Sequence, residues 1–197
     1  AGLVTISTDY VFKGDKEGFY TQRDQPDPES VYAASKLAGE RGAQLAHART
    51  VVVRTGFVFG PGGTNFLSTV VERARRGEKL KAISDSYGTP TFALDLAARL
   101  RRLAQLDLPG IFHVVNAGEG VSFEEFARAA LDLGGYGSFN VESVEMDSLS
   151  RPAPRPRNSR LKCLLSEAVG LAPLPFWKDS LRGFVALDLR SEVAAKD

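Results

Sequence analysis

The amino-acid sequence predicts an α/β protein built on a parallel β-sheet. Short apolar runs rich in β-branched residues, such as Leu3–Thr8 and Thr50–Phe59, alternate with longer segments whose apolar residues recur at helical spacing. This alternation is typical of strands joined by crossover helices. The run Leu3–Thr8 ends in two hydroxyl residues, as a buried strand does when it opens into a site.

The composition is that of an ordinary globular protein. Of 197 residues, 43% are hydrophobic and 25% are charged, and the net charge is +1. Such a small charge gives no reason to expect nucleic acid or an anionic membrane as a partner. Cys163 is the only cysteine, which excludes an internal disulfide and suits a reducing cytoplasm. No apolar run reaches the roughly 18 residues of a membrane span.

The first half of the chain predicts two strands, two helices and a further short strand. A polar loop covers Lys13 to Pro28, and Asp27 is expected to cap the next helix, with Pro28 at its first position. The elements that follow are a helix over residues 29–47, a strand over Thr50–Phe59, a helix over Asn65–Arg76 and a short strand over Lys79–Ile83.

The second half continues the alternation. Asp95 is expected to cap a helix that ends near Leu106, and Ser122 with Glu125 forms a capping box that begins another helix. Gly134-Gly135 ends that helix. The other expected elements are strands over residues 110–116 and 139–144, a proline-rich loop over Arg151–Pro156, a last helix from Trp177 to Leu189 and a frayed tail from Arg190 to Asp197.

Tyr32 and Lys36 form the pair that suggests chemistry. They stand four residues apart in a predicted helix, so both side chains lie on one face. The ammonium charge favours the phenolate, which eases proton transfer from the phenol near neutral pH. Taken alone, the pair is also consistent with an ordinary helix surface.

The pair belongs to a set of four motifs that follow one another in a fixed order, and the set is more specific than the pair alone. They are STDYVF at Ser7–Phe12, YxxSKLAGE at 32–40, RTGFVFGP at Arg54–Pro61 and DSYGTPT at Asp85–Thr91. From Leu3 to Phe184, the chain resembles the extended short-chain dehydrogenase/reductases, and most closely the dTDP-4-dehydrorhamnose reductase family.

The resemblance implies a Rossmann-like parallel sheet with a small C-terminal substrate-binding part. Residues 1–60 and 91–120 would form the C-terminal half of the dinucleotide-binding domain. Residues 61–90 and 121–197 would form the substrate-binding part with the C-terminal helix. The glycine-rich phosphate-binding turn of this fold is not found in the sequence, so the chain is expected to represent the C-terminal two-thirds of the fold.

The resemblance also implies the catalytic residues. Tyr32 would protonate a carbonyl oxygen, Lys36 would hold the nicotinamide ribose and Thr8 would hydrogen-bond the substrate carbonyl. Ser7, Tyr32, Lys36, Gly56 and Val58 would contact the cofactor, which is either NADPH or NADH. A hydroxyl that only caps the end of a strand is the alternative for Thr8.

The expected substrate-binding residues are Thr8, Asp9, Tyr10, Phe57, Asn65 and Arg155. Helix capping is the alternative for Asn65, a core position for Phe57 and a turn-capping role for Asp9. The family pattern has Ser-Trp where this chain has Gly56-Phe57, which leaves the identity of the sugar open. The three arginines of Arg151–Ser159 suit a phosphate clamp, a polyproline ligand or a solvated loop.

The implied function is NAD(P)H-dependent reduction of a 4-keto group on a nucleotide-linked deoxysugar in the cytoplasm, and a homodimer is compatible with it. The alternatives are a non-catalytic regulatory subunit and a sugar-nucleotide epimerase or dehydratase. No metal site is expected, because His47 and His113 lack partners at ligand spacing. His113 lies in a predicted strand and is expected to be a hydrogen-bonded core residue.

Overall fold

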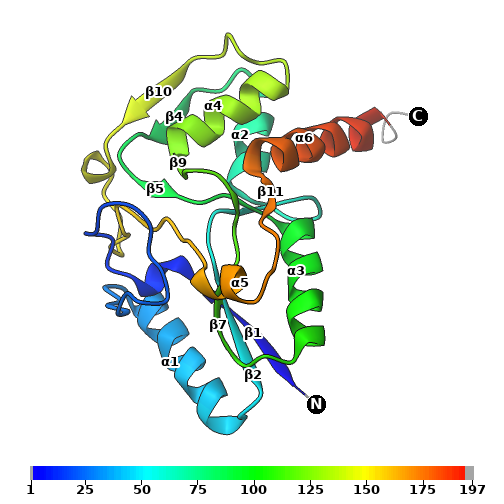
Figure 1. The fold of residues 1–197 in the computed structure, drawn as a ribbon. Coiled ribbons are helices and arrows are strands. Elements are labelled where there is room, and N and C mark those ends of the chain that lie inside the picture. Colours follow the sequence, from blue (N-terminus) through cyan, green and yellow to red (C-terminus); the bar gives the residue numbers. More distant parts are fainter. Residues whose placement is uncertain (1, 194–197) are drawn as a thin grey trace.

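The computed structural model describes residues 2–193, with side chains up to Leu187. Among these residues, the strands β1 (Leu3–Thr8), β2 (Thr50–Thr55) and β7 (Gly110–His113) form a parallel sheet in the order β1-β2-β7. Figure 1 shows this sheet between two helices, α1 (Val31–Ala46) on one side and α3 (Ala93–Leu106) on the other. The predicted parallel α/β architecture is confirmed.

The register of the sheet places the ends of β1 and β2 side by side. Ser7 pairs with Arg54, and Thr8 pairs with Thr55. All six residues of β2 are buried, as expected for a central strand covered on both faces. The hydroxyl residues that end β1 therefore meet the end of β2 at one edge of the sheet.

A second group of elements lies above the sheet in Figure 1. Strand β4 (Leu80–Ile83) pairs in parallel with β10 (Val141–Val144). The helices of this group are α2 (Phe66–Arg75), α4 (Phe123–Leu133) and α6 (Trp177–Val193). The division of the chain into a dinucleotide-binding and a substrate-binding part stays a prediction.

Short strands connect the two groups. β3 (Val58–Phe59) pairs in parallel with β6 (Thr91–Phe92), and β5 (Tyr87–Gly88) pairs antiparallel to β9 (Val121–Ser122). A third pair consists of β8 (Asn116–Ala117) and β11 (Leu174–Phe176).

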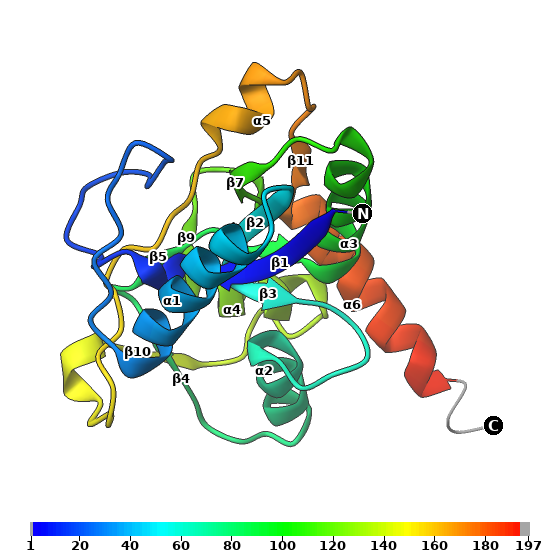
Figure 2. The ribbon, with the colours of Figure 1, turned by 90° about the horizontal axis from the view of Figure 1, so that it is seen from below.

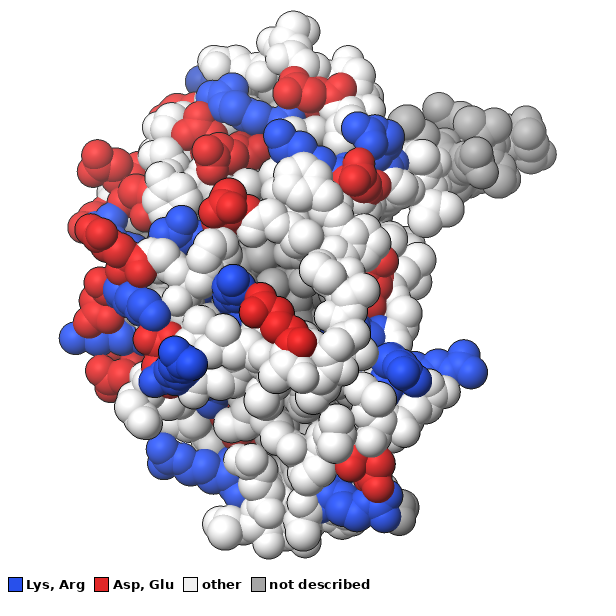
Figure 3. All heavy atoms as spheres, viewed as in Figure 1, with Lys and Arg blue, Asp and Glu red and all other residues white. Residues whose placement is uncertain are grey.

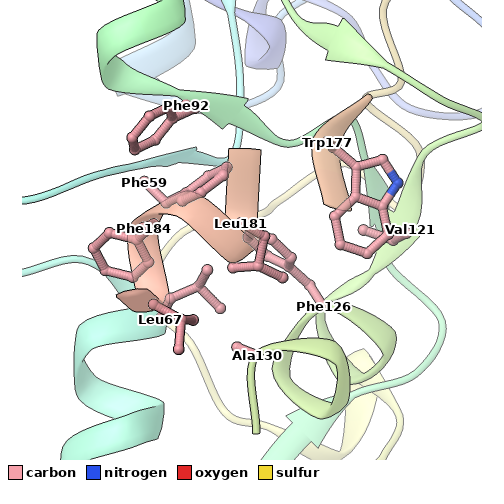
Figure 4. Close-up of a cluster of buried hydrophobic side chains, with 10 residues drawn as sticks. Phe59, Leu67, Phe92, Val121, Phe126, Ala130, Trp177, Leu181 and Phe184 are labelled. Carbon is pink, nitrogen blue, oxygen red and sulfur yellow. The ribbon is translucent and has the colours of Figure 1, made fainter. Parts of the chain in front are cut away.

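An aromatic cluster forms the core of the second group. Figure 4 shows Phe59 and Phe92 from the short strands facing Phe184 and Leu181 of α6 and Phe126 of α4. The Phe59 ring meets the Phe126 ring edge to face at 5.3 Å and the Phe184 ring edge to face at 5.8 Å. Because α4 and α6 share this cluster, both helices are held against the short strands β3 and β6.

The polar loop predicted at Lys13 to Pro28 lies beside the segment that precedes α5 (Leu164–Ala168), as Figures 1 and 2 both show. Tyr20 N donates to Arg160 O at 2.7 Å, and Asn158 Nδ2 donates to Lys16 O at 2.6 Å. These bonds satisfy the backbone of a long loop that has little secondary structure of its own.

Several predicted boundaries are corrected by the structure. The single strand expected over Thr50–Phe59 is broken at Gly56-Phe57, where Phe57 has a φ of 44°. A left-handed residue cannot continue a strand, so β2 and β3 have different partners. The strand expected over residues 110–116 is likewise divided into β7 and β8.

Two predicted helix caps are wrong. Helix α1 is capped by Ser30, whose hydroxyl accepts from Ala33 N at 3.1 Å, and not by Asp27. Helix α3 begins at Ala93 after the N-cap residue Phe92, which places Asp95 in its first turn. There the Asp95 carboxylate accepts hydrogen bonds from Asn116 and Ser180.

Other boundaries agree with the prediction. The capping box of Ser122 and Glu125 and the Gly134 C-cap are confirmed, and residues 151–156 form a loop. Helix α5 and strands β5, β6, β9 and β11 were not predicted, because each is short. The expected tail from Arg190 lies partly outside the described residues, and α6 continues to Val193.

The described surface carries both signs of charge. On the face drawn in Figure 3, Lys and Arg are interspersed with Asp and Glu. Within residues 2–193, no helix combines the length and hydropathy needed to cross a membrane. In the same part of the chain, no cluster of three or more His, Cys, Asp or Glu residues is suited to a metal ion.

Candidate active site

An open cleft of about 350 Å³ lies at the carboxyl ends of β1 and β2. It brings together nine of the predicted site residues, from three separate segments of the chain. These are Ser7, Thr8, Asp9, Tyr10, Tyr32, Lys36, Gly56, Phe57 and Val58. Ile6, Thr55 and Phe123 complete its lining. The carboxyl edge of a parallel sheet is the usual position of a ligand site in this fold class.

Helix α1 brings Tyr32 and Lys36 to this cleft. The Ser30 cap fixes the start of the helix two residues before Tyr32. The Tyr32 side chain is 56% exposed, and its ring meets the Tyr10 ring edge to face at 6.4 Å. Lys36 Nζ donates to Ile6 O at 2.7 Å, which leaves the other two ammonium protons for further acceptors.

Thr8 and Asp9 form the buried floor of the cleft. Thr8 Oγ1 donates to Asp9 Oδ1 at 3.0 Å and accepts from Tyr10 N at 3.2 Å, so it caps the short 3-10 turn Asp9–Val11. Asp9 is 3% exposed, and burial raises its pKa to about 6. Its second oxygen, Oδ2, has no hydrogen-bond partner among the described residues.

Gly56 and Phe57 shape the opposite wall. A Cβ atom on Gly56 would lie 2.3 Å from Asp9 Oδ2, so only glycine leaves room for the Asp9 carboxyl at this backbone position. The Phe57 ring stacks on Phe123 with the ring centres 4.2 Å apart. A Cβ atom on Gly88 would lie 2.3 Å from the Phe57 ring, which accounts for the glycine there. Phe57 is both packed against neighbours and part of the cleft wall.

A buried ion pair lies behind the cleft. Arg54 donates to both oxygens of Glu40, at 2.9 and 2.7 Å, and the two side chains are 4% and 2% exposed. The Ser7 hydroxyl also donates to Glu40. Cofactor binding by Ser7 stays a prediction, with its hydroxyl bound to Glu40 in this structure.

Two predicted substrate-binding residues lie outside the cleft lining. Asn65 caps α2, where its Oδ1 accepts from Ser68 N and its Nδ2 donates to Gly60 O. Arg155 is exposed and lines a second open cleft of about 560 Å³ that also includes Arg151. Tyr10 connects the two clefts electrostatically. Its phenol has a raised pKa because it is buried, and the positive charges of Arg155 and Arg151 oppose this rise.

His113 departs in part from its prediction. It is buried as expected, and its Nδ1 lies 3.0 Å from Lys162 O. Its Nε2, however, has no hydrogen-bond partner among the described residues, so the ring is not fully hydrogen-bonded. Burial lowers the pKa of His113 to about 4, which keeps the imidazole neutral at pH 7.

The sequence analysis missed Glu40, Thr55 and Phe123. Glu40 had a visible signal, because it follows Lys36 by four residues and so shares the helix face of Tyr32. The charged Arg54 in an otherwise apolar strand required a buried partner of opposite sign. Phe123 gave no such signal, because its approach to Phe57 depends on the packing of α4.

Two features define the class of protein. One is the parallel sheet, and the other is the group of a phenol, an ammonium and a hydroxyl at its carboxyl edge. This is a Rossmann-like α/β protein with the fold of the short-chain reductases. More particularly, the chain belongs to the RmlD substrate binding domain family, whose model matches residues 1–189. Both the predicted fold class and the predicted family are thereby confirmed.

Curated relatives agree with this family. The spore coat polysaccharide biosynthesis protein SpsK of Bacillus subtilis is 36% identical over 185 residues, which cover 94% of this chain and 64% of that protein. The dTDP-4-dehydrorhamnose reductase of Mycolicibacterium smegmatis is 36% identical over 189 residues, which cover 94% of this chain and 58% of that protein. The chain therefore spans about three-fifths of the length of these relatives.

Solved structures give the same result. The dTDP-4-dehydrorhamnose reductase of Clostridium acetobutylicum matches with a TM-score of 0.90 and 32% identity, over 95% of this chain and 66% of that one. The Bacillus anthracis enzyme of the same name, in complex with NADP, matches with a TM-score of 0.87 and 33% identity, over 93% of this chain and 65% of that one.

Proposed function

We propose that this chain carries the catalytic site of an NAD(P)H-dependent reductase that acts on the 4-keto group of a nucleotide-linked deoxysugar. The observation that carries the proposal is the joint presence of Thr8, Tyr32 and Lys36 in one cleft at the carboxyl edge of the sheet. The relatives named dTDP-4-dehydrorhamnose reductase and the NADP complex of one of them support this substrate and cofactor.

Each of these three side chains has a role in reduction of a carbonyl. Reduction builds negative charge on the carbonyl oxygen, and donors aimed at that oxygen lower the barrier. Tyr32 gives its phenolic proton to the oxygen. Lys36 lies one helical turn away, and its positive charge favours the phenolate that remains. Thr8 is the second donor to the same oxygen.

The cleft also suits the nicotinamide end of the cofactor, which supplies a hydride when bound. Lys36 has two ammonium protons left for ribose hydroxyls, and the backbone of Gly56 and Val58, which lies in the lining, would contact the nicotinamide amide. The stacked rings of Phe57 and Phe123 give an apolar wall against which a deoxysugar ring can lie.

Arg151 and Arg155 would hold the phosphates of the nucleotide. They line the neighbouring cleft, and their charge reaches Tyr10 at the edge of the catalytic cleft. Arginine suits bidentate contact with phosphate. Asn65 is left out of this proposed site, because both ends of its amide are engaged in the cap of α2. We expect the protein to act in the cytoplasm, and a homodimer is compatible with the proposal.

The test uses the protein expressed from its complete reading frame. Turnover of a panel of nucleotide-linked 4-ketosugars is followed by loss of nicotinamide absorbance, with NADPH and NADH in parallel. Tyr32→Phe should lower kcat by about 100-fold or more, because it removes the general acid. Tyr136→Phe, a tyrosine packed in a separate cluster, is the matched control. Wild-type turnover in Tyr32→Phe, or none by the wild-type protein on any sugar of the panel, would refute the proposal.

A further inference from the structure

The hydroxyl of Thr8 is already engaged on both sides. It accepts from Tyr10 N at 3.2 Å and donates its one proton to Asp9 Oδ1 at 3.0 Å. A threonine hydroxyl has a single proton, and an ionised carboxylate can only accept. With Asp9 ionised, Thr8 therefore has no proton to give to a substrate carbonyl.

A neutral Asp9 reverses this hydrogen bond. Its carboxyl O–H donates to Thr8 Oγ1, whose own proton can then turn toward the cleft. We propose that Asp9 is a positioning residue whose protonated form sets Thr8 as a hydrogen-bond donor to the substrate, and whose ionised form withdraws it. This inference rests on the proposed function, because it concerns the direction of the Thr8 hydrogen bond during reduction.

The surroundings of Asp9 favour the neutral form. The side chain is almost fully buried, and Oδ2 lies close to Gly56 and makes no hydrogen bond with the described residues. An unpaired carbonyl oxygen is less costly to bury than an unpaired carboxylate oxygen. Consistent with this, burial raises the pKa of Asp9 to about 6 against the lowering effect of nearby hydroxyls.

The groups around Asp9 come from each element packed against it. Tyr10 adjoins it on the same turn, and Tyr32 and Lys36 reach the cleft from α1. The Ser159 hydroxyl approaches from the loop before α5 and acts to lower the pKa of Asp9. The charges of Arg151 and Arg155 act to lower the pKa of Tyr10, the residue next to Asp9. Because the cleft holds more than one ionisable side chain, a pH effect must be assigned by substitution.

The kinetic test compares pH profiles of kcat for the wild-type protein and Asp9→Asn, in protein from the complete reading frame. The wild-type kcat should fall by up to about tenfold per pH unit above the apparent pKa of Asp9. In Asp9→Asn this limb should vanish, because the amide Nδ2 donates to Thr8 at every pH. Asp27→Asn, an exposed control, should keep the limb. A limb that persists in Asp9→Asn overturns the inference.

A second test needs no turnover. The NMR signal of the Thr8 methyl group is followed from pH 4 to 8 without substrate. It should titrate with the apparent pKa of Asp9 in the wild-type protein, and Thr8→Val should raise that pKa in the carboxyl ¹³C signal of Asp9, because a hydroxyl donor is lost. A Thr8 signal that does not change overturns the inference. Titration without any reductase activity would support the Asp9–Thr8 coupling while refuting the proposed function.

Discussion

Two carboxyl groups at the cleft are equally buried but differ in their hydrogen-bond partners. Glu40 and Asp9 are each 3% exposed. Glu40 accepts two hydrogen bonds from Arg54 and one from Ser7, whereas Asp9 accepts one from Thr8 and leaves Oδ2 without a partner. Burial alone therefore does not decide the chemistry of a carboxyl group, because its partners set whether the charged form is stabilised.

Glu40 and Asp9 have different hydrogen-bond partners because they lie at different places in the fold. Glu40 belongs to the helix of Tyr32 and Lys36, and its bonds tie that helix to the ends of β1 and β2. Asp9 lies in the lining of the cleft itself, next to Thr8. The ion-paired carboxylate of Glu40 fixes the geometry of the site, whereas the carboxyl group of Asp9 can change its protonation state with pH.

Breaking the buried ion pair should have the largest effect. Glu40→Leu leaves the Arg54 guanidinium buried without its partner, which should lower the free energy of unfolding by about 3–5 kcal/mol. The double variant Glu40→Leu/Arg54→Met should recover most of this loss, because no buried charge remains. Urea denaturation at pH 7 measures both. A single variant that loses less than about 1 kcal/mol would contradict the described role of Glu40.

Removing the unpaired carboxyl should stabilise the protein at neutral pH. The pKa of Asp9 is raised from 3.8 to about 6 in the folded state, so the unfolded chain ionises first and the wild-type protein loses stability as the pH rises from 3.8 to 6. Asp9→Asn removes this loss, worth about 3 kcal/mol above pH 6 and nothing below about pH 3.8.

The difference between Asp9→Asn and wild type should therefore grow by this amount between pH 4 and pH 7.5 in urea denaturation. The difference is the quantity to measure, because His113 titrates in an overlapping window with the opposite sign. Its pKa is lowered to about 4, so the folded protein loses stability as the pH falls from 6.5 toward 4. A difference that is the same at both pH values would contradict an Asp9 with a raised pKa.

An exposed ion pair should have the smallest effect. Arg49 donates to Asp107 through Nε at 2.8 Å, but the two side chains are 51% and 46% exposed. Arg49→Ala should cost about 0–1 kcal/mol, because water screens the charges and solvates the partner that remains. Urea denaturation beside Glu40→Leu gives the comparison. A loss as large as that of the buried pair would show that burial is not what separates them.

The sequence predicted which residues share the cleft better than it predicted their surroundings. Tyr32, Lys36 and Thr8 follow from local spacing and from the motif order, and the register of β1 on β2 brings them to the same edge. The break at Gly56-Phe57 could not be predicted, because the left-handed φ of Phe57 and the close approach of Asp9 to Gly56 arise only in the folded protein. The partners of Glu40 and the stacking of Phe123 likewise depend on packing between distant segments.

Transfer of an isotopic label shows whether the cleft of Thr8, Tyr32 and Lys36 reduces a sugar carbonyl. Protein from the complete reading frame is incubated with a dTDP-linked 4-ketosugar and with NADPH or NADH deuterated at C4 of the nicotinamide. Deuterium is expected at C4 of the sugar product, detected by NMR, and the Tyr32→Phe variant should give little labelled product. Product without label, or equal labelling by Tyr32→Phe, would contradict this role of the cleft.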